Sequence, residues 1–228
     1  MPADVVCVGA HPDDVEIGMG AAAFQMASEG LEVVIVDLTD GEPTPYGTPD
    51  RRRAEAAEAA AALGVRRITL DLPNRELADG LEARKALAAV LRELRPRIVV
   101  GPYAQDAHPD HVAAAAIVLG GRFYAKLSKT DIPGAPHYPR RVYRYAAIHE
   151  ASALVPSFVV PASEEALRAK MDALRAYRSQ FVDNEANAGV LQRVELQTRY
   201  WGSLVGSCAG EPFFATEVVG VRSLDSLV

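Results

Sequence analysis

Short apolar runs alternate with longer stretches of helical pattern along most of this chain, and this alternation limits the folds open to it more than any other feature. A strand, a helix and a second strand in that order build a parallel sheet, because the helix returns the chain to the same edge. We therefore predict an α/β fold: a Rossmann-like, doubly wound, mostly parallel sheet with helices on both faces. One domain is expected over residues 1–228.

The expected elements follow from these runs and from the residues that end them. Gly30, Gly64 and Pro96 stand where three of the helices should stop. The predicted strands are Asp4–Gly9, Glu32–Leu38, Arg67–Leu70, Arg97–Gly101, Val142–Ala147 and Ser157–Val160. The predicted helices are Val15–Glu29, Arg51–Leu63, Glu82–Leu94, His111–Gly120 and Glu164–Arg178. Two segments rich in proline and glycine are expected to be irregular: a rim loop over Asp40–Asp50 and a surface excursion over Leu119–Arg141.

Composition excludes several classes of protein. The chain is 49% hydrophobic and 24% charged, as in globular proteins that bury a full core. A net charge of −6 disfavours binding to nucleic acid or to anionic membranes. No apolar run approaches the roughly 18 residues needed to span a bilayer, and the first residues do not resemble a signal peptide. With only two cysteines and no disulfide framework, we expect a reduced, cytoplasmic protein with neither nucleic-acid nor membrane partners.

A first polar cluster, His11-Pro12-Asp13-Asp14, directly follows the first apolar run. Ligands of open α/β sheets bind at the carboxyl ends of the strands, where this cluster should lie. One interpretation is structural: Asp13 caps the next helix and forms a capping box with Glu16. The other is a metal site, which also accounts for the imidazole and the second carboxylate. In it His11 and Asp14 bind the ion, and Asp13 is a free base beside them.

A second cluster, His108-Pro109-Asp110-His111, follows the apolar run that ends at Gly101. Its structural interpretation is Asp110 as a helix cap beside two exposed histidines. Its functional interpretation makes His111 the third ligand of a site with two histidines and one carboxylate. His108 would then stand just outside the ligand set, with Asp110 orienting its ring and favouring its protonated form.

Three cations, Arg51, Arg52 and Arg53, occupy the expected first turn of a helix, where the helix dipole disfavours positive charge. One of them is expected to point into the site and bind an anionic or hydroxyl-rich group of a substrate. The segment Gly18–Ala23 fits the dinucleotide fingerprint, but its glycines come too late after the first strand. Close packing of helix against sheet explains them better than a nicotinamide cofactor does.

Three functions are compatible with these clusters. A Zn²⁺ hydrolase uses two histidines and a carboxylate with open positions, a base such as Asp13 and an acid such as His108, which together suit amide hydrolysis. A non-haem Fe(II) oxygenase uses the same ligands, but the alternating α/β pattern argues against its usual scaffold. A non-catalytic metal- or nucleotide-binding module would keep the clusters for structure alone.

The two clusters resemble the motifs of the LmbE-like (PIG-L) N-acetylglucosamine deacetylase family. The opening motif matches over Ala10–Glu16 and the second over His108–His111. Arg53–Glu55 resembles the arginine-bearing helix of the family, and Tyr177–Phe181 its C-terminal element. The resemblance implies the LmbE-like fold, with Zn²⁺, or Fe²⁺ in the cell, held by His11, Asp14 and His111. It also implies Asp13 as the general base, His108 as the acid with Asp110 behind it, and Arg53 as the substrate contact.

Within that family, the chain is most similar to the bacillithiol-pathway branch, whose substrate is N-acetylglucosaminyl-malate. The resemblance thus implies an N-acetyl sugar as small-molecule partner and a homo-oligomer, a hexamer. Another N-acyl sugar or small amide is the alternative substrate. Ala209 departs from the aromatic residue that the family often carries before Gly-Glu. Tyr46, His137 and His149 are further residues whose place relative to the pocket is left open.

Overall fold

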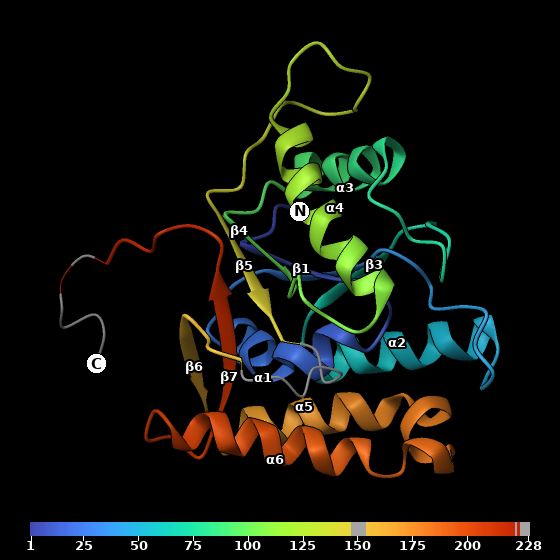
Figure 1. The fold of residues 1–228 in the computed structure, drawn as a ribbon, viewed down its shortest axis with the longest axis vertical. Coiled ribbons are helices and arrows are strands. Elements are labelled where there is room, and N and C mark those ends of the chain that lie inside the picture. Colours follow the sequence, from blue (N-terminus) through green and yellow to red (C-terminus); the bar gives the residue numbers. More distant parts are fainter. Residues whose placement is uncertain (147–153, 222, 224–228) are drawn as a thin grey trace.

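The computed structural model describes residues 1–146, 154–221 and 223, and its centre is a seven-stranded sheet (Figure 1). The strands run in the order β3-β2-β1-β4-β5-β7-β6. All neighbouring pairs from β3 to β5 are parallel, and β7 is antiparallel to both β5 and β6. The strand bounds are β1 Val5–Gly9, β2 Val33–Asp37, β3 Arg66–Thr69, β4 Ile98–Pro102, β5 Arg141–Tyr145, β6 Phe158–Ala162 and β7 Ala209–Ala215.

Helices cover both faces of this sheet, as the sequence predicts (Figure 1). Their bounds are α1 Asp14–Ser28, α2 Pro49–Leu63, α3 Leu81–Leu94, α4 Pro109–Ala125, α5 Glu164–Ala176 and α6 Val190–Ser203. A π-helical turn over Arg178–Val182 and a short 3₁₀ turn over Glu185–Asn187 join α5 to α6. The predicted α/β class with a mostly parallel sheet is confirmed.

Two apolar cores lie on opposite faces of the sheet because successive residues of a strand point to opposite sides. On β1, Val5 and Cys7 belong to the core shared with α1, α2 and α5. Val6 and Val8 belong to the core shared with α3 and α4. Every residue of β1 and β2 is buried, which explains why these strands are continuous apolar runs.

The neighbouring strands β1 and β4 mark the point where the order of the sheet reverses. From β1 the chain passes to β2 on one side, and β4 pairs with β1 on the other. The loops after two such strands diverge and leave a crevice at their carboxyl ends, where α/β proteins bind ligands. Both polar clusters of the sequence follow these two strands.

The structure differs from the expected elements mainly in the second half of the chain. Helix α4 continues to Ala125, so the irregular excursion begins later than Leu119. Helix α6 and strand β7 were not expected at all. Among the described residues, no helix is both long and apolar enough to span a bilayer.

Candidate metal and catalytic site

The loop between β1 and α1 directs its two adjacent carboxylates to different places. Asp13 has a left-handed backbone with φ of 108°, and its side chain makes no hydrogen bond that caps α1. The capping-box interpretation is therefore wrong. Asp14 instead accepts a hydrogen bond from the His11 amide at 2.9 Å. The carboxylate of Asp13 lies 3.7 Å from Nη1 of Arg52.

The three predicted ligands come together as a possible metal site. Ligand atoms of His11, Asp14 and His111 all lie within 4.8 Å of one another. Nε2 of His111 is 3.1 Å from Oδ1 of Asp14, and Nδ1 of His11 is 3.6 Å from Oδ2 of the same residue. A second possible set, made of His11, His108 and Asp110, overlaps the first. We favour the first set because two of its three residues are buried.

Both histidines of this set have their other ring nitrogen held by a carboxylate. Nδ1 of His111 lies 2.9 Å from Oδ2 of Asp106, and Nε2 of His11 lies 3.1 Å from Oδ2 of Asp110. Carboxylate support of this kind orients metal-binding histidines and makes them better ligands. Two imidazoles and a carboxylate are also donors that zinc prefers. The residues therefore fit a zinc ion.

The carboxylates around His11 and His111 also favour a bound cation. Burial acts to lower the pKa of His111, but Asp14 and Asp106 outweigh it and raise that pKa to about 10. Burial likewise opposes protonation of His11, whose pKa is nevertheless raised by Asp14 and Asp110. The cluster thus favours positive charge at its centre, as a cation-binding site does.

His108 is the N-cap of α4, and Asp110 is not. Nδ1 of His108 accepts a hydrogen bond from the Asp110 backbone amide at 3.2 Å. An accepting Nδ1 leaves the ring proton on Nε2 in the neutral form. Burial and the neighbouring His11 and His111 lower the pKa of His108.

These contacts correct the place expected for Asp110. Its carboxylate contacts His11, and it also accepts a hydrogen bond from the Arg75 amide at 2.9 Å. The residue contacts His108 through its backbone. Asp110 acts to raise the pKa of His108, as expected, but burial and the neighbouring His11 and His111 outweigh it and lower that pKa.

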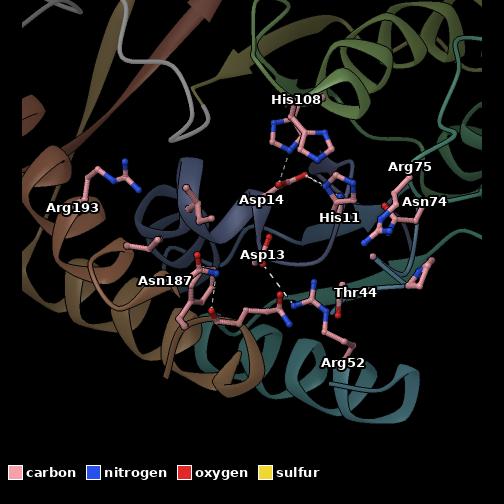
Figure 2. Close-up of a pocket in the computed structure, with 17 residues that line it drawn as sticks. His11, Asp13, Asp14, Thr44, Arg52, Asn74, Arg75, His108, Asn187 and Arg193 are labelled. Carbon is pink, nitrogen blue, oxygen red and sulfur yellow. Dashed lines mark hydrogen bonds and ion pairs between the residues drawn. The ribbon is translucent and has the colours of Figure 1, made fainter. Parts of the chain in front are cut away.

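Asp13 lies in the same pocket, between the histidine cluster and Arg52 (Figure 2). Burial raises its pKa to about 7, Arg52 opposes that shift, and Asp14 adds to it. A carboxyl group with a pKa near neutrality accepts a proton more readily than an ordinary one. Its position and its pKa therefore both suit a base.

The pocket contains Arg52, and this corrects the expectation for Arg53. The Arg52 side chain is only 3% exposed, and its Nη2 donates to the Pro12 carbonyl at 3.0 Å. Arg53 is 62% exposed and pairs with Asp50 on the outside of α2. The resemblance thus selected the neighbouring arginine. Arg51 lies at the surface as well, paired with Glu55 and Asp183.

The site opens into a cavity of about 500 Å³. Its lining includes four residues that the sequence did not single out: Asn74, Arg75, Asn187 and Arg193. Figure 2 shows Arg75 and Arg193 on opposite sides, with the histidines and Asp13 between them. Asp106 was also missed, although it stands two residues before His108 and five before His111. Asp106, an acidic residue so close to two histidines, was the available signal.

The three loop residues left open by the sequence are outside the pocket lining or outside the described chain. Tyr46 is 44% exposed and contributes its carbonyl oxygen to a hydrogen bond from Gln180. Nε2 of His137 lies 2.7 Å from the Pro96 carbonyl, far along the excursion. His149 falls outside the described residues.

Comparison with known proteins adds a family match and close structural likenesses. The family model PIG-L, described as GlcNAc-PI de-N-acetylase, matches residues 6–120. A diacetylchitobiose deacetylase of Thermococcus kodakarensis is 32% identical over 199 residues, which cover 79% of this chain and 71% of that enzyme.

Two further likenesses extend this comparison. A 1D-myo-inositol 2-acetamido-2-deoxy-alpha-D-glucopyranoside deacetylase of Thermobifida fusca is 30% identical over 180 residues. That match covers 62% of this chain and 61% of the enzyme. The crystal structure of a conserved protein from Thermus thermophilus is similar with a TM-score of 0.89 and 37% identity. It covers 96% of this chain and 98% of that one.

Proposed function

Because this chain belongs to the PIG-L family of N-acetylglucosamine deacetylases, we propose that it hydrolyses the N-acetyl group of an N-acetylglucosamine conjugate with the help of zinc. The products are acetate and the free amine. The observation that carries the proposal is the juxtaposition of the His11, Asp14 and His111 cluster with a buried base, Asp13, in one pocket. Fe²⁺ is the alternative occupant of the cluster in the cell, because the same donors suit it.

When bound, zinc supplies Lewis-acid chemistry, polarising an amide carbonyl and making a water molecule more acidic. The residues of the chain handle the protons. Asp13 takes a proton from the attacking water as its oxygen adds to the acyl carbon. Asp13 then passes this proton to the nitrogen as the carbon–nitrogen bond breaks, while His108, with its proton on Nε2, donates a hydrogen bond to the developing oxyanion. The Asp110 amide keeps His108 in that tautomer by donating to Nδ1.

The arginines of the pocket favour an anionic aglycone, and we propose N-acetylglucosaminyl-malate as the substrate. Arg52, Arg75 and Arg193 line one cavity. Guanidinium groups bind carboxylates through paired, charge-assisted hydrogen bonds. The relatives named above act on chitobiose and inositol conjugates, whose aglycones are neutral. Such conjugates, other N-acyl sugars and small amides form the alternative substrate class.

The first experiment measures the free amine that zinc-loaded protein releases from N-acetylglucosaminyl-malate, with the Asp13→Asn variant in parallel. We expect release by the wild type alone, because the variant keeps the ligands and loses the base. Equal activity of the variant would overturn the role of Asp13. Release from diacetylchitobiose or the inositol conjugate in preference to the malate conjugate would overturn the anionic aglycone and keep the deacetylase.

The same preparation discriminates the other functions that the sequence left open. An oxygenase would contain iron after anaerobic purification and would consume oxygen with a co-substrate. A non-catalytic module would bind zinc and release no amine from any N-acetyl sugar. Metal analysis of the purified protein, combined with the amine assay, separates these outcomes.

We also propose that the chain acts as a cytoplasmic homo-oligomer, a hexamer. The outer face of α6 supports self-association because Leu196, Tyr200 and Leu204 are each more than half exposed there. Exposed apolar side chains that lie together commonly mark contacts between proteins. Light scattering after size-exclusion chromatography measures the mass directly, and a mass near 24.4 kDa would contradict the proposal.

A further inference from the structure

Helix α1 is broken five residues after it begins. Met19 has φ of −151° and ψ of 25°, which are not helical values, and the helix resumes beyond it. The break divides a first segment, which carries Asp14 and Glu16, from a longer second segment that runs to Ser28. Sharp breaks of this kind occur where a side chain inserts into the hydrogen-bond ladder of a helix.

A buried ion pair occupies this break. In a regular helix the Ala21 amide donates to the Ile17 carbonyl. Here Nζ of Lys170 donates to the Ile17 carbonyl at 2.7 Å, and Oε1 of Glu211 accepts from the Ala21 amide at 3.1 Å. Nζ of Lys170 and Oε1 of Glu211 are themselves 2.6 Å apart. The Ala22 amide also donates to Glu211, at 2.8 Å.

The pair comes from two distant elements that pack on α1. Lys170 belongs to α5, which lies along α1, and Glu211 belongs to β7 (Figure 1). A methyl group on Gly20 would lie 3.2 Å from Cγ of Lys170, so the lysine stem crosses the helix closely at this glycine. Both charged side chains are only 2% exposed.

Burying two charges is expensive, and an apolar pair of similar volume is often at least as stable. A buried pair that makes four polar contacts at one break therefore does more than add stability. The first segment of α1 is too short to hold its direction alone, because isolated helices need about 12 or more residues. Its carboxyl end is held by Lys170, and its amino end carries Asp14.

We infer that Lys170 and Glu211 are positioning residues that set the direction of the first segment of α1. They thereby place Asp14 opposite His111, and Asp13 beside the cluster, without touching either. The inference rests on the metal site of the proposed function. It adds a distant determinant of metal affinity, in α5 and β7, that lies outside the pocket.

The test is the zinc affinity of Lys170→Met, measured without substrate by competition with a chromophoric chelator. Supporting residues of metal ligands typically change affinity by about 10–100-fold when they are removed, and we expect a loss in that range. Arg92→Met is the matched control. Arg92 is also a buried cation that donates to backbone carbonyls, but these belong to the last residue of α4 and to the excursion that follows it. It should lose stability and keep the zinc affinity of the wild type.

A double variant, Lys170→Met with Glu211→Gln, separates positioning from stability. Removing both charges relieves the buried, unpaired carboxylate, so the melting temperature should recover relative to Lys170→Met. The Ile17 carbonyl still lacks its donor, so the zinc affinity of the double variant should stay at least about 10-fold below that of the wild type. Recovery of the affinity together with the melting temperature would overturn the inference, as would wild-type affinity in Lys170→Met or a loss in Arg92→Met.

The result of this zinc-binding test does not depend on whether the proposed substrate is the true one. Zinc binding by the wild type with no amine release contradicts the proposed activity and leaves the positioning test valid. A wild type that binds no zinc contradicts the metal site, and the inference with it. If Lys170→Met does not fold, the double variant alone decides, by the same comparison with Arg92→Met.

Discussion

At the scale of single residues, the backbone of Asp13 separates the roles of two adjacent carboxylates. Its left-handed φ of 108° is unusual for a residue other than glycine. Strained conformations of this kind are common at functional sites, where the surroundings hold them. Here Asp14 accepts the His11 amide while Asp13 faces Arg52, so one carboxylate joins the ligand cluster and the other stays outside it.

Replacing Arg52 tests this separation. Arg52→Gln removes a cation that lowers the pKa of Asp13, so the acidic limb of the activity profile should move to higher pH. Loss of one charge-assisted contact should also reduce kcat/KM by about 10–100-fold. Arg53→Gln is the matched control, since its side chain lies outside the pocket, and it should behave as the wild type. Equal effects of the two substitutions would contradict the placement of Arg52.

The titration of Asp37 should make the stability of the folded protein depend on pH. Burial raises its pKa to about 7, against roughly 3.9 in an unfolded chain. The folded state therefore binds the proton more tightly, and this contribution to stability is present below about pH 4 and lost as pH rises through about 7. Asp37→Asn lacks this dependence. Its melting temperature relative to the wild type should increase from about pH 5 to about pH 8, and a constant difference would show that Asp37 is ionised throughout.

At the scale of elements, the sequence predicts the strands that have a continuous apolar pattern. It fails for a strand whose burial depends on a residue far away in the chain. Strands β1, β2 and β4 are apolar runs, and they lie where expected. Strand β7 contains Glu211 and Pro212, which indicate a loop in isolation. The partners that satisfy the buried Glu211 are Lys170, 41 residues earlier, and the backbone amides of Ala21 and Ala22 in α1. The sequence around β7 contains no sign of these distant partners, so the strand could not be predicted from it.

The same limit applies to Arg52 and Arg53. Both belong to α2, and neighbouring helical residues point about 100° apart, so an error of one position moves the side chain off the pocket. The two histidine clusters did not have this ambiguity, because the ends of adjacent parallel strands meet at one edge. Their meeting was predictable from the sequence, whereas the wall formed by Asn187 and Arg193 was not.

Gly18 tests the packing of the first segment of α1. A methyl group there would lie 2.1 Å from Cδ2 of Tyr145, whose side chain is fully buried. Gly18→Ala should therefore destabilise the protein by about 1–3 kcal/mol or more through overpacking, measured by urea denaturation. Gly189→Ala is its control, because no atom lies within 4 Å of the added methyl. A stable Gly18→Ala protein would mean that α1 moves easily against the sheet.

At the scale of the whole molecule, the proposed metal ligands come from two loops that are about a hundred residues apart in the chain, so a bound ion would tie these loops together. His11 and Asp14 follow β1, whereas His111 lies in the first turn of α4, after β4. A ligand that binds only the folded state adds about 2.7 kcal/mol at roughly one hundred times its Kd. Removing zinc with a chelator should therefore lower Tm by roughly 5–10 °C in a chain of this size. His11→Ala should melt at one temperature with or without chelator.

The residues that line the pocket come from separate segments of the chain. The proposed metal ligands and the proposed base follow β1 and β4, whereas Arg193 and Asn187 come from the C-terminal segment around α6. The segment around α6 thus contributes part of the proposed recognition surface, while Arg52 and Arg75 contribute to it from α2 and from the loop after β3. An exchange of the segment after α5 between relatives should therefore change the preference for an aglycone and leave the hydrolytic step intact. A scaffold divided in this way can acquire new sugar conjugates while its chemistry stays constant.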